Sequence, residues 1–126
     1  MAKILVVDDE EIITKTFVRL LETRGYTVSV ASSGEEALVK VEAEDFDLIL
    51  SDIRMPGLSG IETVQRIQQL QEERQKPRVP VIFLTGYTDL ALEQEAHRLN
   101  PSAYIYKPFD ALKLLETVAA TLEAKL

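Results

Sequence analysis

The sequence predicts an α/β protein in which helices cover both faces of one parallel β-sheet. Short apolar runs alternate with amphipathic stretches five times along the 126 residues. The apolar runs, such as ILVV at residues 4–7, contain no alternating polar residues, as expected for strands that are buried on both faces. Regular alternation of strands and helices is typical of parallel sheets, because parallel strands need crossover connections.

The predicted elements fill the chain, and no repeat or low-complexity segment separates them. Strands are predicted at 3–9, 26–32, 46–53, 79–85 and 102–107, and helices at 10–25, 33–45, 61–76, 87–100 and 110–126. A chain of this length matches one domain of ordinary size, with a core that needs no disulfide bonds. We therefore expect a single domain over residues 1–126.

Apolar side chains in the first two predicted helices recur at intervals that place them on one face of each helix. They are Ile13, Phe17, Leu20, Leu21, Ala37, Leu38 and Val41. Gly25 is expected to end the first helix, and Ser32 or Ser33 is expected to cap the second.

The later units follow the same pattern. Pro56, Gly57 and Gly60 predict a loop after the third strand. The apolar stripes of the next two helices consist of Ile61, Val64, Ile67 and Leu70, and of Leu92, Ala96 and Leu99. The second stripe is thin, which indicates a loosely held helix. Asp110 is expected to cap the last helix.

Right-handed crossovers leave few ways to wind such a sheet. The natural candidate is the flavodoxin-like (βα)5 fold, a doubly wound five-stranded sheet with strand order 2-1-3-4-5. Ligands of such sheets bind beyond the carboxyl ends of the strands, at the point where the strand order reverses. In this order the point lies between the first and third strands.

Five polar side chains stand at the predicted strand ends. They are Asp8 and Asp9 after the first strand, Asp52 after the third, Thr85 after the fourth and Lys107 after the fifth. Carboxylates without histidine or cysteine suit a hard divalent cation, of which Mg²⁺ is the usual one. The Lys107 ammonium group and the Thr85 hydroxyl can bind an anion beside this cation. The set predicts phosphoryl transfer, with one of the aspartates as the nucleophile.

Composition excludes several other classes. The chain has no cysteine, which rules out disulfides and thiol chemistry. Its net charge of −7 argues against direct binding of this chain to nucleic acid or to an anionic membrane. No apolar run is long enough for a signal peptide or a membrane span, so we expect a cytoplasmic protein. The only histidine, His97, lies on a helix face that is predicted to meet solvent.

Four segments together resemble the receiver domain of bacterial two-component response regulators. They are DDE after the first strand, SDIRMPGLSG after the third, LTG after the fourth and YIYKPF at the fifth. The resemblance extends over essentially the whole chain. Any one of these segments is a weak signal, but their order and their positions at the strand ends make the set specific.

The resemblance implies that Asp52 accepts a phosphoryl group from a sensor histidine kinase or a histidine phosphotransfer protein. Asp9, Asp52 and the backbone carbonyl of Arg54 would bind Mg²⁺ directly, and Asp8 would act through a metal-bound water. Lys107 would contact the phosphoryl group. By the same resemblance, we expect the Lys107–Pro108 peptide bond to be cis.

The resemblance also implies a conformational switch. Thr85 would move to hydrogen-bond the phosphoryl group, and the ring of Tyr104 would then turn inward. The surface formed by the fourth helix, fifth strand and fifth helix would change shape. Tyr106 is the neighbouring alternative, but the spacing to Lys107 favours Tyr104.

Two positions depart from the chemotaxis regulator, a stand-alone member of this family. Arg54 stands where that regulator has asparagine, and Tyr87 stands where it has glutamate. These positions flank the path of the attacking water in the family. Arg54 and Tyr87 therefore predict slow self-dephosphorylation.

Other interpretations remain open from the sequence. Asp8, Asp9 and Glu10 could simply cap the first helix. The chain could be a degenerate receiver that only binds partners, or, less well supported, an aspartyl-phosphate phosphatase of the haloacid dehalogenase type. A receiver acts only on its own Asp52, so we do not expect an enzyme with a separate substrate.

The partners remain unidentified at this level. The resemblance implies either a separate output partner or an output domain that this sequence lacks, and it allows a homodimer that forms on phosphorylation. Kinase specificity in this family usually lies on the first helix and the loop after the fifth strand, so Ile12, Lys15 and Phe109 are candidate kinase contacts.

Overall fold

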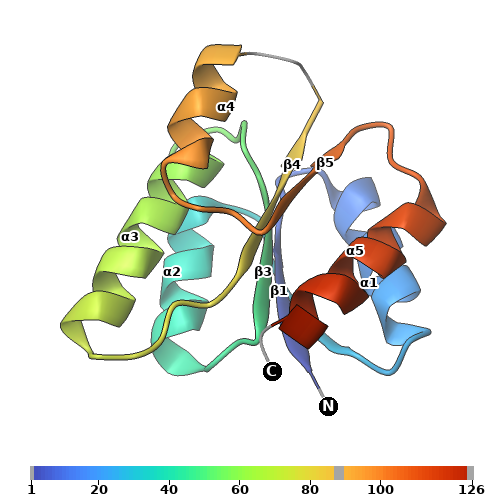
Figure 1. The fold of residues 1–126 in the computed structure, drawn as a ribbon, viewed down its shortest axis with the longest axis horizontal. Helices are drawn as coiled ribbons and strands as arrows, with labels where there is room; N and C mark the ends of the chain where they lie inside the picture. The colour runs from blue at the N-terminus through green and yellow to red at the C-terminus, as the bar shows by residue number, and fades with distance from the viewer. Residues whose placement is uncertain (1, 87–89, 125–126) are drawn as a thin grey trace.

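The computed structural model describes residues 2–86 and 90–124. Its five strands form one parallel sheet in the order β2-β1-β3-β4-β5, which confirms the predicted flavodoxin-like topology (Figure 1). The strands are β1 (Lys3–Val7), β2 (Thr27–Ala31), β3 (Leu48–Asp52), β4 (Val81–Thr85) and β5 (Ala103–Tyr106). The helices are α1 (Glu11–Glu22), α2 (Gly34–Ala43), α3 (Gly60–Glu73), α4 (Leu90–His97) and α5 (Ala111–Ala124).

The observed elements are shorter than the predicted ones. Helix α1 ends at Glu22, and Gly25 follows with a φ of +83°, a conformation that glycine adopts without strain. Strand β5 ends at Tyr106, one residue before the predicted end, although the Lys107 N–H still donates to the Thr85 carbonyl at 2.8 Å. The predicted start of the fourth helix, residues 87–89, lies outside the described residues.

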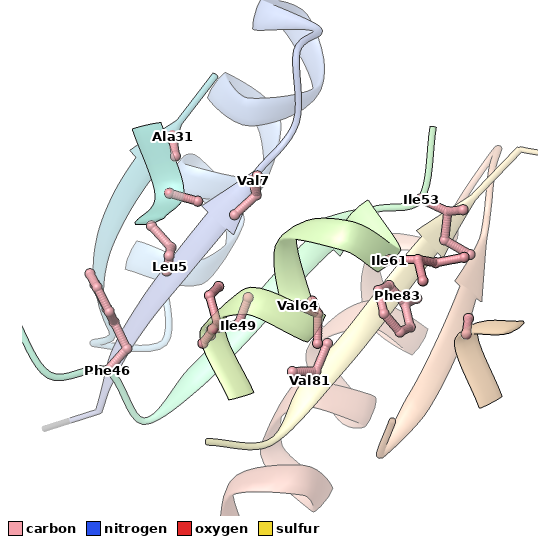
Figure 2. Close-up of a cluster of buried hydrophobic side chains, with 13 residues drawn as sticks. Leu5, Val7, Ala31, Phe46, Ile49, Ile53, Ile61, Val64, Val81 and Phe83 are labelled. Atoms are coloured by element: carbon pink, nitrogen blue, oxygen red, sulfur yellow. The ribbon is translucent and has the colours of Figure 1, made fainter. Parts of the chain in front are cut away.

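Successive side chains of each strand point to opposite faces of the sheet and build two cores. Leu5, Val7, Ile49 and Phe83 face the side covered by α2, α3 and α4. Figure 2 shows this cluster, in which Val64 of α3 is fully buried. Because β1, β3 and β4 are buried on both faces, these strands contain continuous apolar runs in the sequence, whereas the edge strands β2 and β5 are partly exposed.

The second core lies between the sheet and the helix pair α1 and α5 (Figure 1). Ile4, Val6 and Leu50 come from the strands, and Phe17 comes from α1. Its ring packs edge-on against that of Phe109, with ring centres 4.7 Å apart. No helix in the described ranges is both long and apolar enough to span a bilayer.

Side chains cap three of the helices. Ser33 rather than Ser32 accepts the Glu36 N–H at the start of α2, and Asp110 accepts the Leu112 N–H at the start of α5, as predicted. Ser59 and Glu62 form a reciprocal capping box at the start of α3, which the sequence analysis did not identify.

Gly60 holds the β3–α3 loop tightly against the end of β3. Its N–H donates to the Ile53 carbonyl at 2.8 Å. A Cβ atom at this position would lie 1.8 Å from the backbone oxygen of Asp52. Only glycine fits this approach, so the loop fixes the backbone that carries Asp52.

Replacing Gly60 by alanine should lower the free energy of unfolding by about 3 kcal/mol, because a rigid backbone must move to admit the methyl group. Urea denaturation measures the change. Gly86→Ala is the matched control: its Cβ would meet only the Lys107 Cβ at 4.0 Å. We expect that control to cost less than about 1 kcal/mol. Equal losses in the two variants would contradict the proposed role of Gly60.

Candidate functional site

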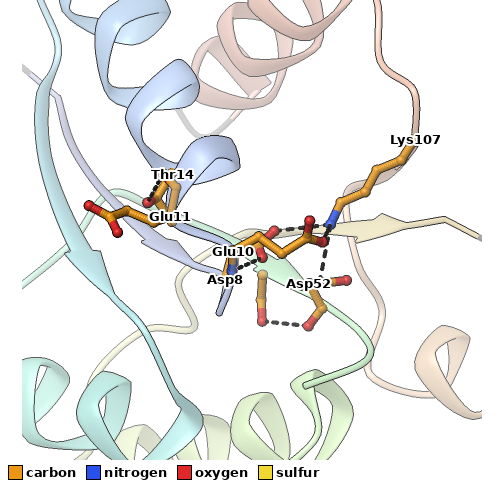
Figure 3. Close-up of polar contacts among 7 residues, drawn as sticks. Asp8, Glu10, Glu11, Thr14, Asp52 and Lys107 are labelled. Carbon is orange, nitrogen blue, oxygen red and sulfur yellow. Dashed lines mark hydrogen bonds and ion pairs between the residues drawn. The ribbon is translucent and has the colours of Figure 1, made fainter. Parts of the chain in front are cut away.

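The polar strand-end residues gather at the carboxyl edge of the sheet, where β1 and β3 lie side by side. Val7 pairs with Ser51 in the β1–β3 register, so Asp8 and Asp52 follow at neighbouring positions. Asp52 is the last residue of β3, and Lys107 reaches in from beyond β5 (Figure 3). The predicted convergence of these three side chains is therefore present.

The ammonium group of Lys107 is the centre of this cluster. Its Nζ lies 3.1 Å from Oδ2 of Asp8, 3.2 Å from Oδ2 of Asp52 and 3.5 Å from Oε1 of Glu10. Figure 3 shows the lysine side chain extending toward the acids from the opposite side. One ammonium group thus forms ion pairs with three carboxylates.

Burial and backbone hydrogen bonds fix the two aspartates. Asp8 is 1% exposed and Asp52 is 6% exposed. Oδ1 of Asp8 accepts the Glu10 N–H at 2.9 Å, and the backbone N–H of Arg54 donates to the Asp52 carboxylate. Both carboxylates are therefore held in place by the loops that follow their strands.

Burial dominates the electrostatics of the cluster. It raises the pKa of Asp52, the nearby Asp8 carboxylate raises it further, and Lys107 only partly offsets them. Burial also raises the pKa of Asp8, against the Glu10 N–H and Lys107, which lower it. Burial alone would lower the pKa of Lys107, but Asp52 and Asp8 outweigh it, and the net shift is upward.

Glu10 is a member of the cluster that the sequence analysis did not assign to it. Carboxylate oxygens of Asp8, Glu10 and Asp52 lie within 4.8 Å of one another. Asp9, the predicted direct ligand, is exposed and lies outside this group. The signal in the sequence was the uninterrupted acidic run, but side-chain reach decides which of its members point inward.

The acids after β1 do not cap α1 through their side chains. Glu10 occupies the N-cap position, yet its carboxylate makes no capping hydrogen bond. Asp8 accepts the N–H of Glu10, which precedes the helix. The capping interpretation of this run is therefore wrong, and Glu10 instead pairs with Lys107.

The donor set fits a hard divalent cation. Three carboxylates converge at a partly buried point, with no histidine or sulfur ligand among them. Mg²⁺ prefers oxygen ligands of this kind and keeps several of its waters. The geometry can therefore hold such an ion if Lys107 gives up part of its contact with the acids.

Thr85 lies further along the carboxyl ends of the strands, whereas Tyr104 lies within β5, opposite Phe83 of β4. Thr85 ends β4 and is 7% exposed. The half-buried ring of Tyr104 lies 6.3 Å from that of Phe83, and its hydroxyl donates to the Glu93 carbonyl at 3.4 Å. Tyr106 is exposed, and its hydroxyl donates to the Glu93 carboxylate at 2.9 Å. Both tyrosines thus connect β5 to α4.

The remaining predicted positions lie around this site. The Lys107–Pro108 peptide bond is cis, as expected. Arg54 and His97 are exposed, whereas Tyr87 lies outside the described residues. Ile12 is 79% exposed on α1. Of the other two proposed kinase contacts, Lys15 pairs with Glu11 and Phe109 packs on Phe17.

Comparison with known proteins places this site in a family. The model of the response regulator receiver domain matches residues 4–119. The chain belongs to the response regulator receiver domain family. In structure, the receiver is similar to the chemotaxis response regulator CheY4 of Vibrio cholerae, with a TM-score of 0.86 at 33% identity over 96% of this chain and 98% of that one.

Two transcriptional regulators illustrate the relatives of this receiver. The Escherichia coli protein ZraR is 37% identical over 98% of this chain, and the Bacillus subtilis alkaline phosphatase synthesis regulator PhoP is 40% identical over 95% of it. The matches cover 26% of ZraR and 48% of PhoP. The receiver therefore spans a quarter to a half of the length of these curated relatives.

Replacing Asp52 by asparagine should stabilise the fold at neutral pH. The pKa of Asp52 is raised above 3.8 in the folded state, so its stability contribution falls as pH rises through the folded pKa. Removing this charge also removes the repulsion between the Asp52 and Asp8 carboxylates. Thermal unfolding without divalent cations should show a Tm higher by a few degrees at pH 7, and no gain below the unfolded pKa.

Asp45→Asn is the matched control, since Asp45 is exposed and its carboxylate pairs with Lys76, which lowers its pKa. Its loss should leave Tm unchanged or slightly lower. A drop in Tm for the Asp52 variant at pH 7 would contradict the electrostatic account of the cluster.

Proposed function

We propose that this receiver is a signalling module in a two-component phosphorelay, in which Asp52 accepts a phosphoryl group from a histidine kinase or a histidine phosphotransfer protein. The observation that carries the proposal is the geometry at Asp52: a buried carboxylate at the strand end, 3.2 Å from the Lys107 ammonium, within a cluster of acids. Family membership supports it.

Asp52 is the nucleophile in this proposal. One carboxylate oxygen forms the bond to phosphorus as the bond from phosphorus to the histidine nitrogen of the donor breaks, and that nitrogen keeps the electron pair. Lys107 stabilises the charge on the phosphoryl oxygens from its position beside Oδ2 of Asp52. Little further covalent chemistry is required of the protein, so positioning and charge neutralisation dominate.

We assign the Mg²⁺ site to Asp8, Asp9, Asp52 and the backbone carbonyl of Arg54, and we add Glu10 because of its place in the cluster. When bound, the ion supplies positive charge to the phosphoryl oxygens. Asp8 and Asp52 are already fixed by their backbone hydrogen bonds. Asp9, being exposed, would have to turn inward to join them.

Phosphorylation would be read out by the surface of α4, β5 and α5. Thr85 follows the phosphoryl oxygens toward Asp52, and the space it leaves admits the ring of Tyr104. The hydroxyl of Tyr104 donates a hydrogen bond to the Glu93 carbonyl at 3.4 Å. This is a long and therefore weak hydrogen bond, which the tyrosine can lose at little cost when its ring turns. The thin apolar stripe of α4 supports a helix that can shift.

The receiver would act in the cytoplasm on no separate substrate, and its output would come from a partner, an attached domain or a homodimer formed on phosphorylation. Arg54 and Tyr87 would slow hydrolysis of the phosphoryl group, Arg54 by its charge near the site and Tyr87 by its bulk. ZraR and PhoP are named as transcriptional regulators, which makes control of transcription the first output to test.

Incubation with acetyl phosphate and Mg²⁺ should add one phosphoryl group to the chain, because Asp52 can attack a small phosphoryl donor without a kinase. Intact-mass spectrometry measures the gain. We expect none with Asp52→Asn, none after removal of Mg²⁺ with a chelator, and slow decay once the donor is removed.

Asp45→Asn should be labelled like the wild type. Labelling that persists in the Asp52 variant would contradict the assignment of the phosphoacceptor. Absence of labelling with both acetyl phosphate and a panel of histidine kinases would favour a receiver that only binds partners. Turnover of a phosphate ester would instead favour a phosphatase.

Thr85→Ala should still accept the phosphoryl group but should uncouple it from Tyr104. Fluorotyrosine incorporation lets ¹⁹F NMR follow the ring, with the Tyr104 signal assigned by Tyr104→Phe. The signal should move on phosphorylation in the wild type and in Tyr106→Phe, the control. An equal movement in Thr85→Ala would show that the proposed coupling is wrong.

A further inference from the structure

A cavity lies at the amino ends of the strands, opposite the carboxylate cluster. Its volume is about 320 Å³. It is lined by residues from the start of β3, the C-terminal ends of α2 and α3, and the segment 74–79 that leads into β4. Figure 1 shows where these elements lie in the fold. None of its lining residues belongs to the cluster around Lys107. Its volume falls at the lower end of the range for small-ligand pockets, about 300–1,000 Å³.

The inner wall of this cavity is apolar. Phe46 and Ile49, at the start of β3, line it together with Leu70 of α3 and Val79. Phe46 is 5% exposed and Ile49 is 1% exposed, so these residues are part of the core shown in Figure 2. A flat apolar group, such as an aromatic ring, would be in contact with side chains rather than with water.

Gln71 adds an unsatisfied polar group to this wall. It is 5% exposed, and its Oε1 has no hydrogen-bond partner in the described part of the chain. The other buried glutamine of α3, Gln68, does donate, to the Leu99 carbonyl at 3.0 Å. Buried polar atoms are nearly always paired, so this oxygen, which now has almost no accessible surface, would gain a partner from a ligand if the carboxamide rotated toward the cavity. Its last side-chain torsion is broad and nearly two-fold, which lets either amide atom face the cavity.

The acids at the rim already have partners. Glu44 pairs with Lys3, and Asp45 pairs with Lys76 at 2.8 Å. Asp47 accepts the backbone N–H of Lys3 at 2.8 Å. These carboxylates therefore do not attract a further cation strongly.

The arginines at the rim are different. Arg74 and Arg78 both line the cavity and are exposed, and neither guanidinium makes an ion pair within residues 2–86 and 90–124. The unpaired charge at the cavity mouth is thus positive, although the whole chain carries −7. A guanidinium binds carboxylates through directed, charge-assisted hydrogen bonds.

We propose that this cavity binds a small aromatic carboxylate. The ring would lie against Phe46 and Leu70, the carboxylate would meet Arg74 and Arg78, and the Gln71 carboxamide would supply a hydrogen bond. This site is separate from the phosphorylation site, so it does not depend on the function proposed for Asp52.

The probe for the test is para-fluorophenylacetate, titrated into the unphosphorylated protein. Amide chemical-shift changes in ¹H–¹⁵N NMR should be confined to residues around the cavity, such as Gln71 and Val79. For a ligand this small we expect a Kd of about 1 mM. The neutral analogue para-fluorophenylacetamide should bind about tenfold more weakly, because it lacks the charge.

The double variant Arg74→Gln/Arg78→Gln should also weaken binding of the carboxylate about tenfold, since both changes are on the surface and leave the core intact. Arg66→Gln, an exposed change on α3 away from the cavity, and Asp52→Asn should bind like the wild type. Shifts that do not localise to the cavity, equal binding of the neutral analogue, or unchanged binding by the double variant would each overturn the proposal.

Discussion

Lys107 holds together carboxylates that would otherwise repel one another, and the functional edge of the molecule is arranged around this contact. Asp8 and Asp52 are almost completely buried at neighbouring strand ends, where burial raises the pKa of both. The ammonium group lies 3.1 and 3.2 Å from their oxygens and also contacts Glu10. One ammonium group therefore only partly neutralises the carboxylates, and a bound cation or phosphoryl group would change the charge interactions of the cluster directly.

The rest of the fold holds these charged side chains in position. The two core layers pack against the two faces of β3. Gly60 lets the β3–α3 loop lie directly against the Asp52 backbone. On the other side of the site, α4 packs on the core through Ala96 and Leu92, and the tyrosines of β5 reach it through hydrogen bonds to Glu93. Among residues 91–97 of α4 only Ala96 is buried, so we expect this side of the site to move more easily than the β3 side.

The sequence predicted the parts that follow from periodicity and chain order. Apolar runs and amphipathic stretches identified every strand and helix, and the crossover rule then placed Asp8, Asp52 and Lys107 at one edge. Glu10 was missed because the direction of an exposed side chain is not encoded in a local pattern. The cavity beside Gln71 was missed for a related reason: it arises where three separate segments pack incompletely.

The measurement that tests the central claim most directly is a Mg²⁺ titration followed by amide NMR, on the wild type and on Asp52→Asn. If the acids around Lys107 form the ion site, the wild type should show saturable shifts confined to the loops after β1 and β3. The variant should need far more Mg²⁺ for the same change. Absence of saturable shifts in the wild type, or identical titrations of the two proteins, would contradict the account.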